Sequence, residues 1–115
     1  MENVVLEKSH QFALRIVRLY RYLCDEKQEF VLSRQALNCG TEVGARVKAA
    51  QEAEAKPIFY QEMGVARRQA SKTEYWLQLL HESEILDEKA FTSIHADCVE
   101  LLKLLTAILK SENRT

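Results

Sequence analysis

Glutamate, histidine and cysteine are the side chains of this sequence that could carry metal or acid–base chemistry. Glu7 and His10 form one Glu-x-x-His spacing, which on a helix places a carboxylate and an imidazole on the same face. A di-iron centre in a helical bundle needs two such pairs and two further carboxylates. Neither His81 nor His95 has a glutamate three residues before it. The sequence therefore predicts no metal ligands and no cofactor, and a metal-dependent bundle enzyme remains the minor alternative.

Cys39 is the candidate nucleophile, but a thiol is activated only beside a base. Its position on the apolar face of a helical segment favours an inert, buried thiol, so we expect no catalytic residue. The cysteines are odd in number, far apart and without zinc-type spacing, at Cys24, Cys39 and Cys98. This usage is typical of reduced thiols in a cytoplasmic protein.

Two groups of basic residues could bind the phosphates of RNA or DNA. The first recurs every three residues near the N-terminus and comprises Arg15, Arg18 and Arg21. The second comprises Arg67, Arg68 and Lys72. Together they would form a cationic surface whose affinity for nucleic acid falls steeply with salt. The alternative is an ordinary solvated helix face, because a net charge of −1 gives no global attraction to nucleic acid.

Acidic residues gather in the first and third connections between the predicted helices. In an antiparallel bundle these connections share one end, which should therefore repel nucleic acid. Several of the acids also lie near helix starts, where the helix dipole stabilises negative charge. The residues are Asp25, Glu26, Glu29, Glu82, Glu84, Asp87 and Glu88.

Two pairs of residues suggest close packing between helices or between subunits. Gly40 and Gly44 lie on one flank of a helical segment, where their missing side chains let another helix approach closely. Tyr75 and Trp76 are adjacent, so both cannot face the same core. We expect Tyr75 and Trp76 to contribute to a subunit interface. The alternatives are tolerated surface glycines and an ordinary exposed tyrosine.

Four helical segments must position these residues, at about 9–24, 31–53, 57–83 and 87–111. The composition favours helix throughout, with 47% hydrophobic residues, three glycines and one proline in 115 residues. Apolar residues recur every three or four positions in the last two segments, as in helices that cross at about 20° in a bundle. We predict a single all-α domain over residues 1–115, an up-down-up-down antiparallel four-helix bundle. No apolar run reaches the ~18 residues of a membrane span, and the N-terminus has no signal-peptide layout.

Three stretches resemble a family of small bacterial four-helix-bundle proteins first described as products of intervening sequences in 23S rRNA genes. They are "LSRQALNCGTEVGARVKAAQEA", "PIFYQEMGVARRQASKTEYWLQLL" and "LLKLLTAIL". The most specific positions are Gln35, Cys39-Gly40-Thr41 with Gly44, and Thr73 to Leu77. The resemblance implies a ring-shaped homopentamer. Relatives include basic accessory proteins of diversity-generating retroelements, which bind nucleic acid and partner a reverse transcriptase.

Four positions depart from that family's pattern, and each removes an acid or adds a base. They are Arg46, Ala49, Gln69 and Lys72. Arg46 lies near the edge of an apolar face, where an unpaired buried charge would be very costly. We expect it to reach solvent, to pair with an acid such as Glu62 or Glu74, or to line a space between subunits.

The sequence thus favours a non-enzymatic, homo-oligomeric assembly protein, pentameric by resemblance, that binds RNA, DNA or a nucleic-acid-handling protein. A protein–protein interaction module without nucleic-acid binding is the alternative from another class. No feature of the sequence names the physiological partner.

Overall fold

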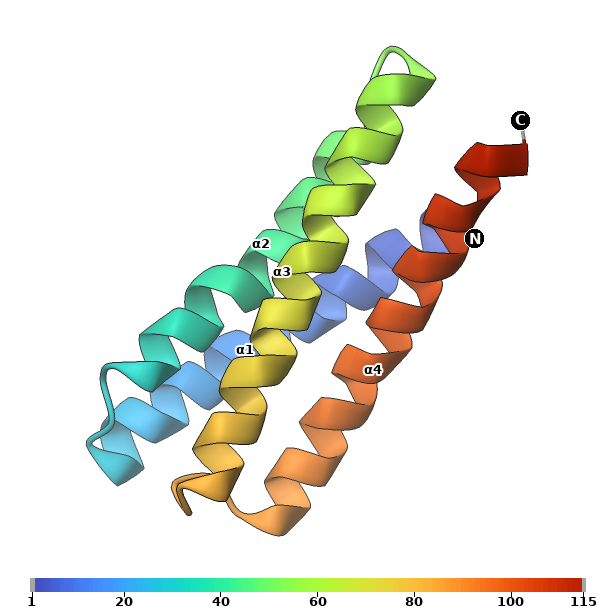
Figure 1. Ribbon diagram of the computed structural model, residues 1–115. Helices are drawn as coiled ribbons and strands as arrows, with labels where there is room; N and C mark the ends of the chain where they lie inside the picture. The colour runs from blue at the N-terminus through green and yellow to red at the C-terminus, as the bar shows by residue number, and fades with distance from the viewer. Residues whose placement is uncertain (1, 115) are drawn as a thin grey trace.

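A computed structural model describes residues 2–114 and shows four antiparallel α-helices running up, down, up and down (Figure 1). The helices are α1 (Glu2–Lys27), α2 (Leu32–Gln51), α3 (Lys56–Glu82) and α4 (Glu88–Lys110), followed by a 3-10 turn at Ser111–Arg114. Within residues 2–114 there is no β-strand. The predicted all-α four-helix bundle is confirmed. No helix in this part of the chain is long and apolar enough to cross a membrane.

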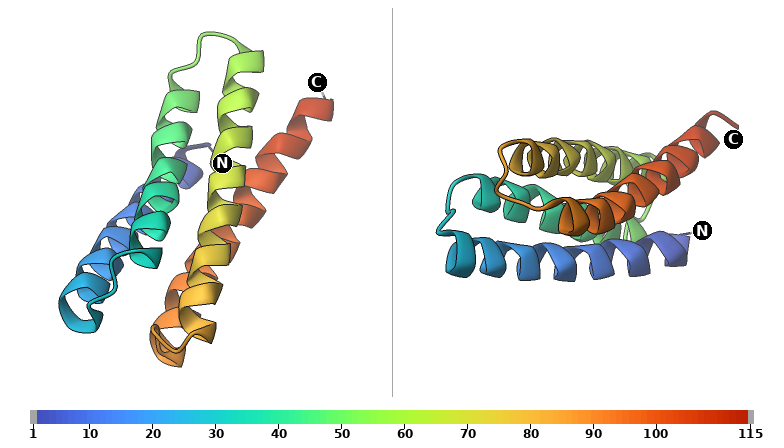
Figure 2. Two further views of the ribbon diagram at one scale, coloured as in Figure 1. Left: turned by 60° about the vertical axis from the view of Figure 1, so that its left-hand side comes forward. Right: turned by 90° about the horizontal axis from the view of Figure 1, so that it is seen from below.

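The order of the helices around the bundle determines which surfaces can meet. α1 packs against α2 and α4, and α3 packs against the same two helices, so α1 and α3 are diagonal (Figure 2). The α2/α3 interface is the most extensive and the α1/α4 interface the least. α4 leans away from α3 toward its C-terminal end (Figure 1), which leaves a groove between these two helices.

The core follows the apolar spacing of the four helices, because positions three and four apart lie on one helix face. Its fully buried large side chains come from all four helices and include Phe12, Ile16, Val43, Val47, Met63, Leu77, Leu80, Leu101 and Leu105. Each helix presents one such face inward, so the opposite faces and the flanks are left for function.

The first helix begins at Glu2, about seven residues before the predicted start near residue 9. Val5 and Ser9 are fully buried, so the apolar face of Phe12 continues two turns toward the N-terminus. The Ser9 hydroxyl does not mark a helix start but donates to the carbonyl oxygen of Leu6 at 3.1 Å. The bounds of the other three helices differ from the predicted ones by one or two residues.

The α1/α2 and α3/α4 connections lie at the same end of the bundle, as predicted, and their acids have structural roles (Figure 1). The Glu29 carboxylate accepts hydrogen bonds from the backbone N–H groups of Val31, Leu32 and Ser33 at 3.1, 2.9 and 2.7 Å. Asp87 accepts from the N–H of Ala90 at 2.8 Å and caps α4. These acids satisfy N–H groups that have no partner within the helix.

Gly40 and Gly44 both face α1 within the same chain. A Cβ atom on Gly40 would lie 2.9 Å from Cγ1 of Ile16, and one on Gly44 would lie 3.3 Å from the backbone oxygen of Ser9. The two glycines therefore let α1 approach α2 closely. Their role at a subunit interface remains a prediction.

The charge of Arg46 is satisfied by two glutamates. Its Nε donates to Glu42 at 2.9 Å, and its Nη1 donates to Glu62 at 3.0 Å. Glu62 is one of the two acids predicted as partners. The fork ties α2 to α3 at the edge of the core, with the guanidinium still reaching solvent.

Candidate functional site

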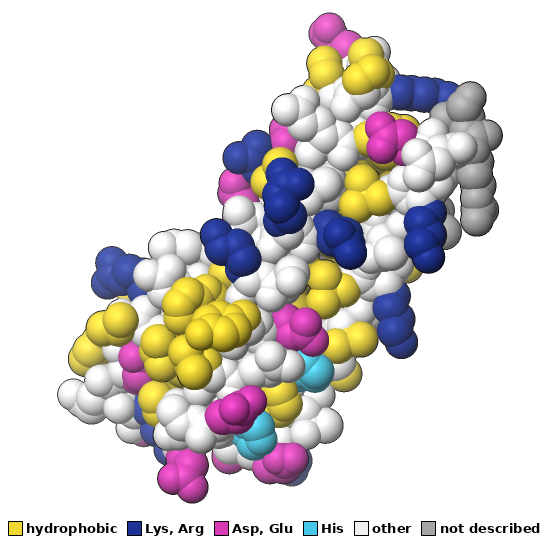
Figure 3. Space-filling model, in the orientation of Figure 1, with side chains coloured by type: hydrophobic (Ala, Val, Ile, Leu, Met, Phe, Trp, Pro, Cys, Tyr) yellow, Lys and Arg dark blue, Asp and Glu magenta, His cyan; other side chains and the backbone are white. Residues whose placement is uncertain are grey.

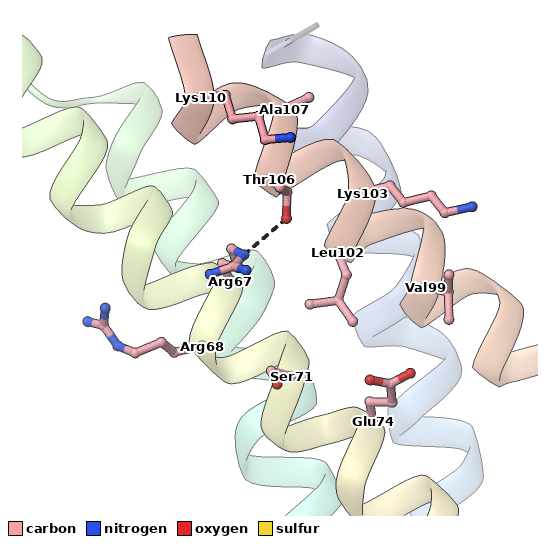
Figure 4. A pocket seen from close by; sticks show the side chains of 10 residues that line it. All are labelled: Arg67, Arg68, Ser71, Glu74, Val99, Leu102, Lys103, Thr106, Ala107 and Lys110. Carbon is pink, nitrogen blue, oxygen red and sulfur yellow. Dashed lines mark hydrogen bonds between the residues drawn. The ribbon is translucent and has the colours of Figure 1, made fainter. Parts of the chain in front are cut away.

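A groove of about 640 Å³ runs between α3 and the C-terminal half of α4 (Figure 4). The aliphatic part of its lining, which we call the floor, comprises the half-buried Val99 and Leu102 and the exposed Ala107 of α4. Its rim is cationic, with Arg67 and Arg68 on α3 and Lys103 and Lys110 on α4. The groove lies where α4 diverges from α3, toward the C-terminal end of α4 (Figure 1).

Four cations on the rim give most of the groove a positive charge. Arg67 donates from Nε to the hydroxyl of Thr106 at 3.0 Å, which fixes the guanidinium across the groove (Figure 4). Among the described side chains, no carboxylate lies within ion-pair distance of Arg67, Arg68, Lys103 or Lys110. Lys72, exposed on the next turn of α3, is likewise without an ion pair in this part of the chain. Figure 3 shows lysine and arginine side chains gathered across the middle of this face.

The groove ends at an acidic residue that is held by a stack of rings. Glu74 lines the groove and lies 2.9 Å from Nε2 of His95. The His95 ring stacks on Phe91 with centroids 4.8 Å apart, and Phe91 stacks on His81 at 4.3 Å. His81 donates from Nδ1 to the carbonyl of Leu86, since a carbonyl can only accept. The stack fastens α3 to α4 near their connection and closes one end of the groove.

The arginines predicted on α1 are placed elsewhere. Arg15 reaches across to α4, where it contacts Asp97 at 2.6 Å and the Ser93 hydroxyl at 2.9 Å. It therefore ties α1 to α4. Arg18 lines a separate hollow between these helices, and Arg21 is exposed.

Within a single chain the six basic residues do not form one surface, so a joint basic surface repeated around a ring stays a prediction. α1 and α3 are diagonal, so the α1 arginines cannot join Arg67, Arg68 and Lys72. α4 supplies the neighbouring cations instead. Lys103 and Lys110 were not predicted, although their seven-residue spacing places them on one flank of a helix that packs against α3.

Tyr75 and Trp76 lie on the outer side of α3. The Tyr75 side chain is 56% exposed, and its ring meets the half-buried Trp76 edge-on with centroids 5.1 Å apart. Figure 3 shows hydrophobic side chains gathered over the halves of α2 and α3 that lie nearest the acidic α1/α2 and α3/α4 connections. Tyr75 is thus an aromatic side chain with no covering element in this chain.

The thiols and the Glu-x-x-His pair assemble no reactive group in the described residues. Burial raises the pKa of Cys98 to about 12 and also raises the pKa of Cys39. Nowhere between residues 2 and 114 do three His, Cys, Asp or Glu side chains gather closely enough to share a metal ion. The cations on the rim of the groove suit binding of an anionic surface.

Comparison with known proteins agrees with this architecture. The family model described as 23S rRNA-intervening sequence protein matches residues 1–107. A solved structure from Bacteroides thetaiotaomicron VPI-5482, described as a protein with unknown function from the S23 ribosomal protein family, is 42% identical to the chain. It aligns with a TM-score of 0.93 over 95% of this chain and 97% of that one. No curated protein matches the chain. The chain belongs to the 23S rRNA-intervening sequence protein family.

Proposed function

We propose that this protein is a non-enzymatic, homo-oligomeric assembly protein that binds nucleic acid through phosphates. The observation that carries the nucleic-acid part is the α3/α4 groove, whose rim presents four cations without a carboxylate partner among the described residues. Phosphate contacts supply most of the affinity of sequence-independent nucleic-acid binding. The acidic connections lie beyond Glu74, so they would repel the strand toward the cationic part of the groove.

The self-assembly part is supported by Tyr75 and by the family. An exposed aromatic ring braced by a neighbouring tryptophan is typical of interface anchors. A cytoplasmic pentamer is the form that family resemblance suggests. Repetition of the groove around such a ring would multiply phosphate contacts without any new contact within a chain.

Fluorescence anisotropy of labelled single-stranded DNA and structured RNA tests the nucleic-acid part, at about 50 and 200 mM salt, where phosphate-driven binding changes most. We expect salt-sensitive binding by the wild type and much weaker binding by an Arg68→Ala/Lys103→Ala/Lys110→Ala variant. A matched control, Arg34→Ala/Lys48→Ala/Lys56→Ala, removes the same charge away from the groove. Equal losses in both variants would show that net charge, and not the groove, determines binding.

The aliphatic floor supports a second candidate function, which is binding of an acidic amphipathic helix from another protein. Such a helix would place apolar side chains on Val99, Leu102 and Ala107 and carboxylates on the rim. An assembled oligomer that binds neither DNA nor RNA at either salt concentration would favour this function over the first. Elemental analysis of untagged protein tests the remaining enzyme hypothesis, which needs stoichiometric iron, manganese or zinc.

A further inference from the structure

A second hollow, of about 440 Å³, lies between α1 and the N-terminal part of α4, on the side with the least helix contact. Its apolar wall includes Leu19, Leu86, Ala90 and Ile94, of which Leu86 and Ile94 belong to the core. The hollow therefore opens directly onto the bundle interior. We call it the α1/α4 hollow.

The rim of the α1/α4 hollow is suited to an aromatic ring. Tyr22 of α1 is 42% exposed, and Arg18 beside it makes no ion pair with any described residue. Arg15, which also lines the hollow, is already paired with Asp97. A free guanidinium at the edge of an apolar hollow attracts the face of an aromatic side chain.

Tyr75 lies on the opposite side of the molecule from the α1/α4 hollow. It projects from the side of α3 away from the buried Ala70 and Leu77, and α3 is diagonal to α1. A chain cannot place its own Tyr75 in its own hollow. A second copy can do so, in a contact that joins different surfaces of the two subunits.

Both surfaces lie at the same level along the bundle. Tyr75 is seven residues, or about 10 Å, before the end of α3, and Leu19 is eight residues, or about 12 Å, before the end of α1. Both of these helix ends are at the acidic end of the bundle. Two copies with parallel axes can therefore bring the ring and the hollow together without sliding.

Glu82 and two lysines at that otherwise acidic end can pair in the same arrangement. Glu82 lies two turns after Tyr75 on the outer side of α3. In a parallel copy it would reach the end of α1 and the start of α4, which carry Lys27 and Lys89. None of these three exposed residues forms an ion pair within the described chain.

We propose that Tyr75 of one subunit inserts into the α1/α4 hollow of the next. This inference rests on the proposed self-assembly and names the two surfaces that make it. Because they lie on opposite sides of one chain, the contact is head-to-tail and repeats around a ring that closes when the rotation permits. The α3/α4 groove faces a third side and stays open.

Cross-linking between co-expressed chains tests the pairing. One chain carries Gln78→Cys, one turn from Tyr75, and the other carries Ala90→Cys in the hollow. Both also carry Cys24→Ser, because Cys24 is half-exposed while Cys39 and Cys98 are buried. A short bismaleimide should join residue 78 of one chain to residue 90 of the other, as mapped by mass spectrometry. Ile58→Cys, likewise at an exposed position but near the far end of α3, is the control and should not cross-link to residue 90.

Adding Tyr75→Ala to the Gln78→Cys chain should abolish the product and weaken association by more than about tenfold, as loss of an interface anchor does. An oligomeric wild type without the 78–90 product would overturn this inference and leave self-assembly intact. A cross-link between residue 90 of one chain and residue 90 of another, formed with Ala90→Cys chains alone, would show a symmetric contact and would also overturn the proposed pairing. A monomeric wild type by light scattering would contradict both proposals. If Ala90→Cys impairs folding, Leu19→Cys can replace it as the cross-linking position in the hollow.

Discussion

Burial should set the order in which the three cysteines react. Burial raises the pKa of Cys98 to about 12, and the negative charge of Glu74 adds to the rise. A thiol with that pKa is thiolate in only about one molecule in ten thousand at pH 8. Burial likewise raises the pKa of Cys39. We therefore expect iodoacetamide at pH 8 to label half-exposed Cys24 first and the other two only after unfolding. Equal labelling of Cys98 and Cys24 in folded protein, by mass spectrometry, would contradict the buried position.

Glu29 should contribute to stability as a cap of α2. Partial burial alone would raise its pKa, but hydrogen bonds from the N–H groups of Leu32, Ser33 and Val31 outweigh burial and hold the pKa below 4.5. Glu29→Ala leaves these donors without their partner. We expect a loss of about 1 kcal/mol in the free energy of unfolding at pH 7, measured by urea denaturation. Glu26→Ala, at an exposed position in the last turn of α1, is the control and should have little effect.

The contribution of Glu29 should also depend on pH in a definite direction. A carboxyl whose pKa is lower in the folded protein stabilises it above the unfolded value, and this contribution disappears as pH falls through the folded value. The difference in stability between wild type and Glu29→Ala should therefore be constant above about pH 5.5 and shrink below pH 4.5. A difference that grows on acidification would exclude this cap mechanism.

At the scale of the helices, the three glycines should respond to substitution in opposite directions. Gly64 is open, since its added Cβ would meet only Arg68 Nη1 at 3.7 Å. Gly64→Ala should stabilise the protein by up to about 1 kcal/mol through helix propensity. Gly44→Leu must displace the backbone of α1, and Gly40→Ala must displace Ile16. Each should destabilise by about 1–3 kcal/mol.

Thermal and urea unfolding of the three glycine variants would test this ordering. An unchanged melting temperature for Gly44→Leu would show that α1 is not held against the backbone of α2 at this point. Stabilisation by Gly64→Ala alone would also separate helix propensity from packing, because all three glycines lie within helices.

The helices were predictable because their apolar periodicity reports the core directly. The start of α1 was not, because the first turns are largely polar and only Val5 and Ser9 among their described side chains are fully buried. The candidate site was half predictable. Arg67, Arg68 and Lys72 stand out on one helix, but their partners Lys103 and Lys110 follow only from the adjacency of α3 and α4. Residue spacing shows which side chains share a face of one helix, but the groove is formed by side chains of two helices.

At the scale of the whole molecule, the acidic connections and the cationic groove lie at different levels along the bundle. The acidic connections occupy one end, while the cationic groove lies along the side toward the other. A ring built by Tyr75 and the α1/α4 hollow would keep every groove at the same level and every acidic end on the same side. Nucleic acid would then meet a belt of cations, and binding would depend on assembly as well as on each groove.

This dependence predicts how assembly should change the salt sensitivity of binding. For duplex DNA, the logarithm of affinity falls with the logarithm of salt at about −0.9 per phosphate contacted. Tyr75→Ala keeps every groove residue and changes a side chain that is exposed in the single chain, so its helix content by circular dichroism should match that of the wild type. The measurement is the slope of log affinity against log salt on a duplex long enough to follow the ring. The Tyr75→Ala variant should show the slope expected of one groove, and the wild type should show a slope several times steeper. Equal slopes from an assembled wild type and a dissociated variant would mean that one groove alone contacts the duplex. The belt would then be irrelevant to binding, even if the ring itself forms as proposed.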